Sequence, residues 1–317
     1  MAFHGDKVRE LAAQFLTLAE KQRATAPLMI GHRVMGFSLL MTGDLAESRT
    51  HLDRAVALYD PAEHRRLAAR FGVDTGMLIL CYRSWAQWML GYPEAALVDI
   101  DDALKNAREI GQAATLMFGL FHASLSHRLC GNYLAANALV EELVALADEK
   151  GAFFWKAFGM LNQGCMLALT GKPSDAVHTI TAGITALRST GATLFTPLQL
   201  SYLAGAYAEL GNFDDGWRCI NEAMTLVETT KESLWEAEVN RIAGELARMP
   251  PEPDAAKAEG YFERALAVAR AQQAKSWELR AATTWRGSGA IRASGMKPAM
   301  SSLRSTVGSA KASTRST

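Results

Sequence analysis

The sequence predicts an all-α protein, a right-handed superhelix of tandem helical hairpins with a period of about 40 residues. Two series of residues keep this step. The first consists of turn glycines, each followed by a new helical pattern: Gly91, Gly131, Gly171 and Gly211. The second consists of small residues inside the following helix: Ala96, Ala136, Ala176 and Gly216. A fixed period of this length indicates a repeat array, in which each hairpin buries its apolar face only against its neighbours.

A helical stripe opens the chain over residues 8–19, with Val8, Leu11, Phe15 and Leu16 on one face. This stripe resembles the second helix of a hairpin without its first, so we expect the array to start in mid-repeat. We also expect the uncapped apolar flank to self-associate. Six helical pairs follow: 27–42 with 45–60, 74–90 with 93–110, 112–130 with 133–150, 152–170 with 173–190, 195–210 with 213–229, and 232–247 with 254–273.

Two places interrupt the period. The step from Gly43 to Gly91 is longer than the others, and a longer loop is expected around residues 60–72. Prolines near residue 250 replace the turn glycine of the last pair. The small-residue series fails at Ser48 and Leu143, where looser packing between the helices is expected.

One repeat matches the tetratricopeptide pattern of aromatic, glycine and small residues, although its period is longer than that family's. Its residues are Tyr207, Gly211, Phe213, Gly216, Ile220 and Ala223. The chain as a whole resembles the C-terminal tetratricopeptide-like region of bacterial signalling proteins that combine a nucleotidyl (adenylate/guanylate) cyclase with a regulatory ATPase. The resemblance rests on RFGVDTG at 70–76, LGYPEAAL at 90–97, DALKNAREIG at 102–111 and AKAEGYFERALAVAR at 256–270. It implies a regulatory module in signal transduction, without a cyclase or ATPase active site of its own.

The composition and charge of the chain argue against several classes of function. The chain has 317 residues, 49% of them hydrophobic, no run of apolar residues long enough to span a membrane, and no secretory leader pattern at residue 1. A cytoplasmic protein is therefore expected. The body to residue 278 contains all 33 acidic residues and all but seven of the 33 basic ones, which argues against nucleic-acid binding by this part. The four cysteines lie in apolar helical stretches without a CxxC pair and are expected to be buried thiols: Cys81, Cys130, Cys165 and Cys219.

The seven basic residues beyond Glu278 change the character of the C-terminus. We expect the repeat array to cover residues 1–284 and a basic, Gly/Ser-rich tail to cover 285–317. A disordered tail or a nucleic-acid arm would account for this composition. We favour a third interpretation, a shifted reading frame, because the alternative frame can encode an amphipathic helix there. The chain would then be a detached fragment.

No catalytic or metal-binding pattern is present. The sequence has no phosphate-binding G-x-x-x-x-G-K-[ST] motif, and the histidines form neither HxxxH nor HExxH. His122 and His127 are five residues apart, which places them on different sides of a helix. We therefore expect no enzyme, no cofactor and no metal.

The first helices of the repeats are poor in charge and rich in aromatic residues. In tetratricopeptide arrays the first helices line the concave groove, which by position places eight residues on it: Arg33, Phe37, Tyr82, Trp85, Phe118, His122, Phe158 and Asn162. They form either a core packed on both sides or a groove for an amphipathic helix or apolar peptide, with Arg33 and His122 as polar contacts. Alanine substitution of Tyr82 and Trp85 would unfold the protein if the core interpretation holds.

The sequence thus predicts a non-catalytic interaction or sensor module, the detached regulatory part of a cyclase–ATPase protein. The alternative is a free-standing adaptor that binds a partner helix or peptide in its concave groove.

Overall fold

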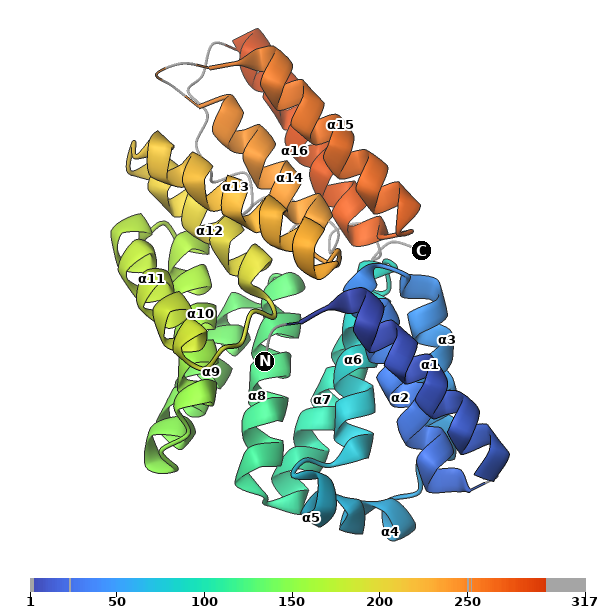
Figure 1. Cartoon of the computed structure of the whole chain (residues 1–317). Helices are drawn as coiled ribbons and strands as arrows, with labels where there is room; N and C mark the ends of the chain where they lie inside the picture. Colours follow the sequence, from blue (N-terminus) through green and yellow to red (C-terminus); the bar gives the residue numbers. More distant parts are fainter. Residues whose placement is uncertain (1–2, 23, 250, 252, 295–317) are drawn as a thin grey trace, which may run out of the picture.

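A computed structural model describes residues 3–22, 24–249, 251 and 253–294, and every regular element within them is a helix. The fold class is as predicted, an all-α solenoid of helical hairpins. The pairs are α2 (Thr25–Thr42) with α3 (Leu45–Leu58), α6 (Thr75–Met89) with α7 (Pro93–Ile110), α8 (Ala113–Leu129) with α9 (Tyr133–Glu149), α10 (Phe153–Leu169) with α11 (Pro173–Ser189), α12 (Thr196–Glu209) with α13 (Phe213–Thr230), and α14 (Glu236–Ala247) with α15 (Ala255–Ala271). Figure 1 shows these hairpins following one another around a curve.

Two single helices flank the six pairs. α1 (Gly5–Gln22) packs on α2 through Ala12 and Leu16. An adjacent face of α1 exposes Leu11, Phe15 and Leu18. At the other end, α16 (Lys275–Ser294) follows α15 and packs against it.

The helix α16 continues past residue 284, after which we expected the tail to begin. Residues 295–317, which contain most of that segment, lie outside the described residues. The division into an array at 1–284 and a tail at 285–317 therefore stays a prediction, as does the shifted reading frame.

The hairpin turns are made by glycines in the left-handed backbone region, as predicted. Gly91 has φ of 94° and Gly131 of 79°, values that a side chain would strain. At three junctions on the opposite edge of the array a residue other than glycine adopts positive φ: Phe195, Lys231 and Gln273. The junction with Phe195 also contains Gly191, with φ of 74°, whereas the other two contain no glycine. Phe195 and Lys231 belong to loops that enter the interior, described below.

The expected looser packing at Ser48 and Leu143 is wrong. Both residues are fully buried, and the close approach is made by a glycine on the neighbouring helix instead. A Cβ on Gly36 would lie 3.3 Å from the backbone oxygen of Ser48, and one on Gly159 would lie 3.6 Å from Leu143 Cγ. The small residue that allows the close approach is on the partner helix here, so the two helices still pack closely.

The long connection after α3 is a chain of short helical turns rather than the expected loop: α4 (Pro61–His64), η1 (Arg65–Leu67) and α5 (Ala68–Phe71). Asp60 caps the first turn by accepting a hydrogen bond from the Ala62 N–H at 2.9 Å. The Asp74 side chain caps α6 in the same way, through the Met77 N–H.

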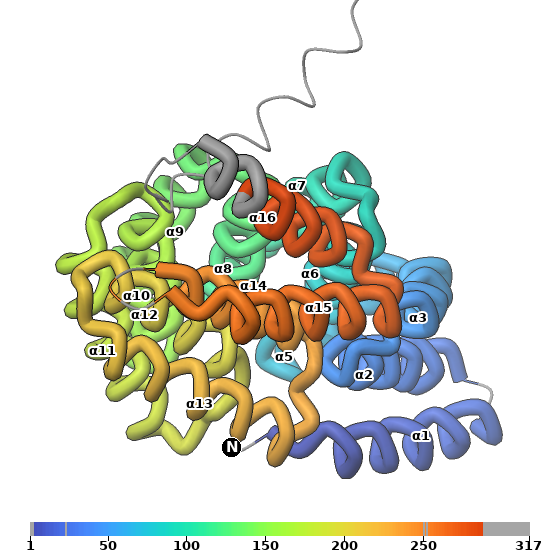
Figure 2. Tube along the Cα trace, turned by 90° about the horizontal axis from the view of Figure 1, so that it is seen from above, coloured from blue at the N-terminus to red at the C-terminus, as the bar shows by residue number. Residues whose placement is uncertain are grey.

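The first helices of the pairs lie inside the curve and the second helices outside it, as the view from above shows (Figure 2). The inner set is α2, α6, α8, α10, α12 and α14, joined by α16, which contacts α6. The last helix of the array therefore meets one of the first. The inner helices, on which we expected the groove, are therefore joined on one side by α16.

Candidate functional site

Four aromatic side chains from consecutive inner helices form a row on the inner face. Phe37 of α2, Tyr82 of α6, Phe118 of α8 and Trp155 of α10 contact one another in this order, with ring centroids 4.7, 6.1 and 5.5 Å apart. Phe37, Phe118 and Trp155 are partly exposed, whereas Tyr82 is almost buried. We call these four residues the aromatic row. They are the part of the inner face where apolar rings remain within reach of a ligand.

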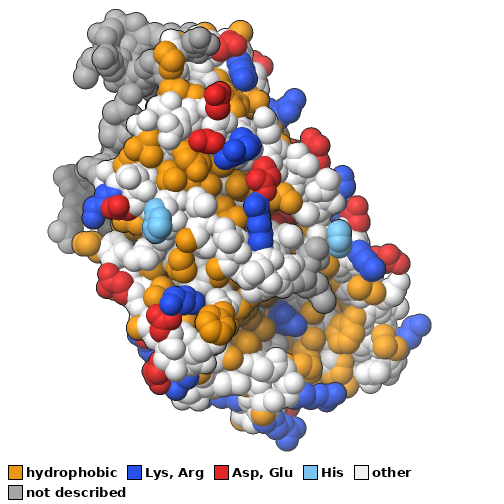
Figure 3. Space-filling model, turned by 60° about the vertical axis from the view of Figure 1, so that its left-hand side comes forward, with side chains coloured by type: hydrophobic (Ala, Val, Ile, Leu, Met, Phe, Trp, Pro, Cys, Tyr) orange, Lys and Arg blue, Asp and Glu red, His pale blue; other side chains and the backbone are white. Residues whose placement is uncertain are grey.

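Figure 3 shows a hollow in the molecular surface below the middle of the molecule, with largely hydrophobic walls and a basic side chain visible within it. The exposed Phe154, which contacts Trp155, extends the row at its α10 end. Sequence reasoning missed Trp155 and Phe154. The sequence did indicate them, because they lie one helical turn before Phe158 in a segment that is rich in aromatic residues.

Arg33 lies at the α2 end of the row, one turn before Phe37. The guanidinium is partly exposed, but its Nε is buried and has no hydrogen-bond partner within the described residues. Burial lowers the pKa of Arg33, and the nearby Tyr82 only partly opposes this effect. Arg33 is thus an unpaired cation at the edge of an apolar surface.

The other expected groove residues lie deeper. Trp85 is fully buried, and Phe158, Asn162 and His122 are no more than 3% exposed. They belong to a central aromatic cluster behind the row, which consists of Trp85, Phe121, His122, Phe158, Phe195 and Trp235. With Tyr82, which is 7% exposed, five of the eight expected groove residues are therefore buried in this structure.

His122 is a structural member of this cluster. Its ring stacks on Phe118 at 4.1 Å and on Trp85 at 4.5 Å, and its Nδ1–H donates to the Phe118 carbonyl at 3.0 Å. Burial lowers the pKa of His122 to about 3, so the ring is neutral at physiological pH. At 2% exposure it is part of the core in this structure, and not a polar contact on the groove surface as we expected. Asn162 is also internal and donates to Ser124 Oγ at 2.8 Å, which links α10 to α8.

Two loops carry aromatic rings into the central cluster. Phe195 precedes α12 and Trp235 precedes α14, and both rings contact Trp85. The carboxylate of the buried Glu232 holds the two loops together, because its Oε1 accepts from the Phe195 N–H at 2.8 Å and from Trp235 Nε1 at 3.1 Å. Burial raises the pKa of Glu232 to about 8, although both hydrogen bonds favour the charged form.

The two ends of the array are joined by hydrogen bonds to helix C-termini. The Met41 carbonyl of α2 accepts from Ser233 N–H at 3.0 Å, and the Trp88 carbonyl of α6 accepts from Ser276 Oγ at 2.5 Å. The Leu129 carbonyl of α8 accepts from Arg280 Nη2 at 2.7 Å. Carbonyls in the last turn of a helix lack hydrogen-bond partners within that helix. Here, later parts of the chain donate hydrogen bonds to such carbonyls in three successive inner helices. We call these three contacts the closure.

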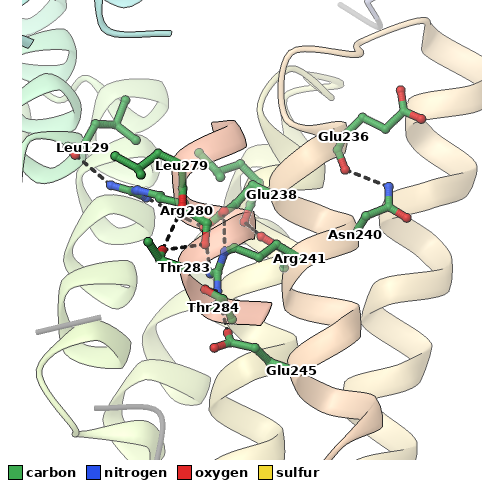
Figure 4. Close-up of polar contacts among 12 residues, drawn as sticks. Leu129, Glu236, Glu238, Asn240, Arg241, Glu245, Leu279, Arg280, Thr283 and Thr284 are labelled. Carbon is green, nitrogen blue, oxygen red and sulfur yellow. Dashed lines mark hydrogen bonds and ion pairs between the residues drawn. The ribbon is translucent and has the colours of Figure 1, made fainter. Parts of the chain in front are cut away.

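Arg280 also joins the closure to a buried ion cluster (Figure 4). Its guanidinium lies 5.0 Å from the ring centres of both Trp88 and Trp277, and its Nη1 is 3.9 Å from Glu238 Oε1. Burial alone would lower the pKa of the neighbouring Arg241, but Glu238 and Glu245 outweigh burial and raise it. The interior at this end is therefore held by charge pairing rather than by apolar contact alone.

The described residues offer no metal centre and no reactive thiol. No group of three or more His, Cys, Asp or Glu side chains among them is arranged to hold a metal ion. The cysteines are unpaired, and burial raises the pKa of Cys81, Cys130, Cys165 and Cys219. No helix in the described part of the chain combines the length and hydropathy needed to cross a membrane.

Comparison with solved structures shows the fold alone. A Rap protein complexed with competence and sporulation factor has a TM-score of 0.61 at 11% identity, over 86% of this chain and 72% of that one. The apo form of RapI has a TM-score of 0.53 at 10% identity, over 81% of this chain and 97% of that one. The APC/C hetero-tetramer Cut9-Hcn1 has a TM-score of 0.53 at 13% identity, over 87% of this chain and 46% of that one. No protein-family model and no curated protein matches the sequence.

Proposed function

We propose that this chain is a non-catalytic interaction module that binds a segment of another protein along the aromatic row. The observation that carries the proposal is the partial exposure of Phe37, Phe118 and Trp155, which form a continuous row of rings on the inner helices. Aromatic anchors in a concave apolar surface dominate the energetics of many protein interfaces. A helix or an extended peptide could place its apolar side chains there.

The structural neighbours support this class of function. They are helical-repeat proteins, and one of them is complexed with a competence and sporulation factor. At 10–13% identity they support the class only, and the partner must come from the chemistry of this chain's own surface. We retain a cytoplasmic location and the absence of catalysis as parts of the proposal. Turnover of ATP by the purified chain would contradict the latter.

We further propose that the module is the regulatory C-terminal part of a bacterial cyclase–ATPase signalling protein. The sequence resemblance supports this origin. Such regulation requires that a ligand contact two states of the module differently. Two such states could differ in whether the contacts of the closure are formed. These contacts join distant parts of the chain through only a few hydrogen bonds.

The alternative is a free-standing adaptor that uses the same surface. Coding sequence upstream of residue 1 distinguishes the two. A cyclase or ATPase in the same frame favours the regulatory part, and an isolated promoter favours the adaptor.

Affinity selection tests the binding surface itself. The purified chain would be incubated with a pool of random octapeptides, and the retained peptides would be identified by mass spectrometry. We expect retention of peptides rich in apolar residues, and loss of that retention in Phe37→Ala and Phe118→Ala.

Phe153→Ala is the matched control, because this phenylalanine is 80% exposed on α10 and makes no ring contact with the aromatic row. Circular dichroism would verify that all three variants fold. Equal retention by Phe118→Ala and Phe153→Ala would contradict binding at the row.

A further inference from the structure

The inner helices that form the aromatic row carry no acidic residue. None of α2, α6, α8 and α10 contains Asp or Glu, although each contains at least one basic residue. The positive charge of these four helices is therefore not balanced by acidic residues of their own. A surface of this kind attracts an anionic group.

Arg33 is the basic residue of these helices that is both unpaired and accessible. By contrast, Arg83 of α6 forms two hydrogen bonds to Asp99 at 2.6 and 2.7 Å, and Lys156 of α10 pairs with Asp148 at 2.7 Å. Arg128 of α8 also lacks a hydrogen-bond partner among the described residues, but it is only 2% exposed and packs over Tyr202. Among the described basic residues of these four helices, Arg33 is therefore the one that combines partial exposure with a buried, unsatisfied donor.

An unpaired, partly buried guanidinium is unfavourable for folding. Its donors lose water without gaining acceptors, and burying such a group costs free energy unless a partner compensates. Nothing in the fold requires a cation here, since Arg33 makes no ion pair or hydrogen bond within the described residues. A ligand acceptor would satisfy the guanidinium, which forms two parallel hydrogen bonds with a carboxylate.

The position of Arg33 indicates where the carboxylate lies in the ligand. α2 is the first of the described helices that line the inner face, and the aromatic row extends from it in one direction only, toward α10. A ligand that follows the row therefore ends at Arg33. A terminal carboxylate fits this arrangement because no chain has to continue past the guanidinium.

We propose that the ligand of the aromatic row is the C-terminal segment of a protein or peptide. Its terminal carboxylate pairs with Arg33, and the apolar side chains that precede it pack on Phe37, Tyr82 and Phe118. This inference rests on the proposed function and specifies the partner of the same surface.

The test uses the random octapeptide pool in two forms, one with free C-terminal acids and one with C-terminal amides. The wild-type chain is expected to retain free acids roughly 10- to 100-fold better than amides, the usual effect of a charge-assisted pair. In Arg33→Gln this preference should vanish while some apolar selection persists. Arg218→Gln is the control, because Arg218 lies on the outer helix α13 and its side chain is 72% exposed.

The outcomes separate the two proposals. Equal retention of acids and amides by the wild type, with apolar selection intact, overturns the terminal carboxylate but leaves peptide binding standing. Selection of internal Glu or Asp regardless of the terminus overturns it as well. Retention of neither pool overturns the proposed function together with this inference.

A stability measurement distinguishes a ligand contact from a structural role. If Arg33 serves a ligand, Arg33→Gln should unfold at the same temperature as the wild type or a higher one. A clear loss of stability in Arg33→Gln would show that the arginine holds the fold, and would overturn the assignment.

Discussion

Replacing Arg241 should be one of the most damaging single changes in this protein. Its guanidinium donates to Glu238 through Nε at 2.7 Å and Nη2 at 3.0 Å, and to Glu245 through Nη1 at 2.7 Å. The side chains of all three residues are at most 4% exposed. Arg241→Met would leave two carboxylates in the interior without their main partner. Breaking a buried charge pair in this way typically costs about 3–5 kcal/mol.

The assay is urea unfolding followed by circular dichroism, with the free energy of unfolding compared between variants. Arg218→Met is a closely matched control. Arg218 follows its partner Asp215 at the same i,i+3 spacing, but the two side chains are 72% and 40% exposed. Exposed pairs contribute from about zero to about 1 kcal/mol, so the control should be nearly neutral.

The pH dependence supplies a second check. Burial would raise the pKa of Glu238, but Arg241 outweighs it and lowers that pKa. The pair therefore stabilises the folded state above the unfolded pKa of glutamate, and this contribution is lost as the pH falls through the folded value. The difference between Arg241→Met and the wild type should shrink in acid. A loss below about 1 kcal/mol at neutral pH, or one equal to the control, would refute the view that this cluster depends on charge pairing.

Four further predictions follow from other contacts. Glu232 has a raised pKa of about 8, so its contribution to stability should decline as the pH rises from about 4.5 to 8, and Glu232→Gln should flatten this decline in thermal melts across that window. Arg280→Met should accelerate amide hydrogen exchange in α16 and in the last turns of α6 and α8, and unchanged exchange would contradict the closure. Gly164→Ala should cost about 1–3 kcal/mol, because a Cβ there would lie 3.0 Å from a backbone nitrogen of α11, whereas Gly260→Ala, with open space, should not destabilise by calorimetry. Phe15→Glu should reduce any concentration-dependent association seen by sizing, and association that persists would exclude the exposed face of α1 as its cause.

Repetition in the sequence was sufficient to predict the hairpins. The turn glycines and the small residues recur at a fixed step because each hairpin meets the same local constraint, a left-handed residue at the turn and a close helix crossing. Ser48 shows the limit of this argument. The same crossing can be made by a glycine on the other helix, and Gly36 does so here.

The division of the inner face into core and surface could not be read from the sequence. Trp85 and Phe118 lie on the inner sides of neighbouring helices, and periodicity treats them alike. Trp85 is buried because Phe195 and Trp235 reach it from loops about 110 and 150 residues further along the chain. Phe195 takes up the left-handed conformation four residues after Gly191, and Lys231 does so in a junction without glycine. The turn-glycine pattern therefore did not predict that these loops enter the interior.

The closure of the array has a consequence for how such a protein can evolve. An open solenoid gains or loses a hairpin by changing one interface, since each repeat contacts only its neighbours. Here Ser276 must reach Trp88, 188 residues earlier, and Arg280 must reach Leu129, 151 residues earlier. Each hairpin contributes a fixed rotation, so one hairpin more or fewer between these contacts would carry the last helix past its acceptors. Arrays ordinarily change length by duplication or deletion of whole repeats. We expect that this chain cannot do so unless it loses the three contacts of the closure.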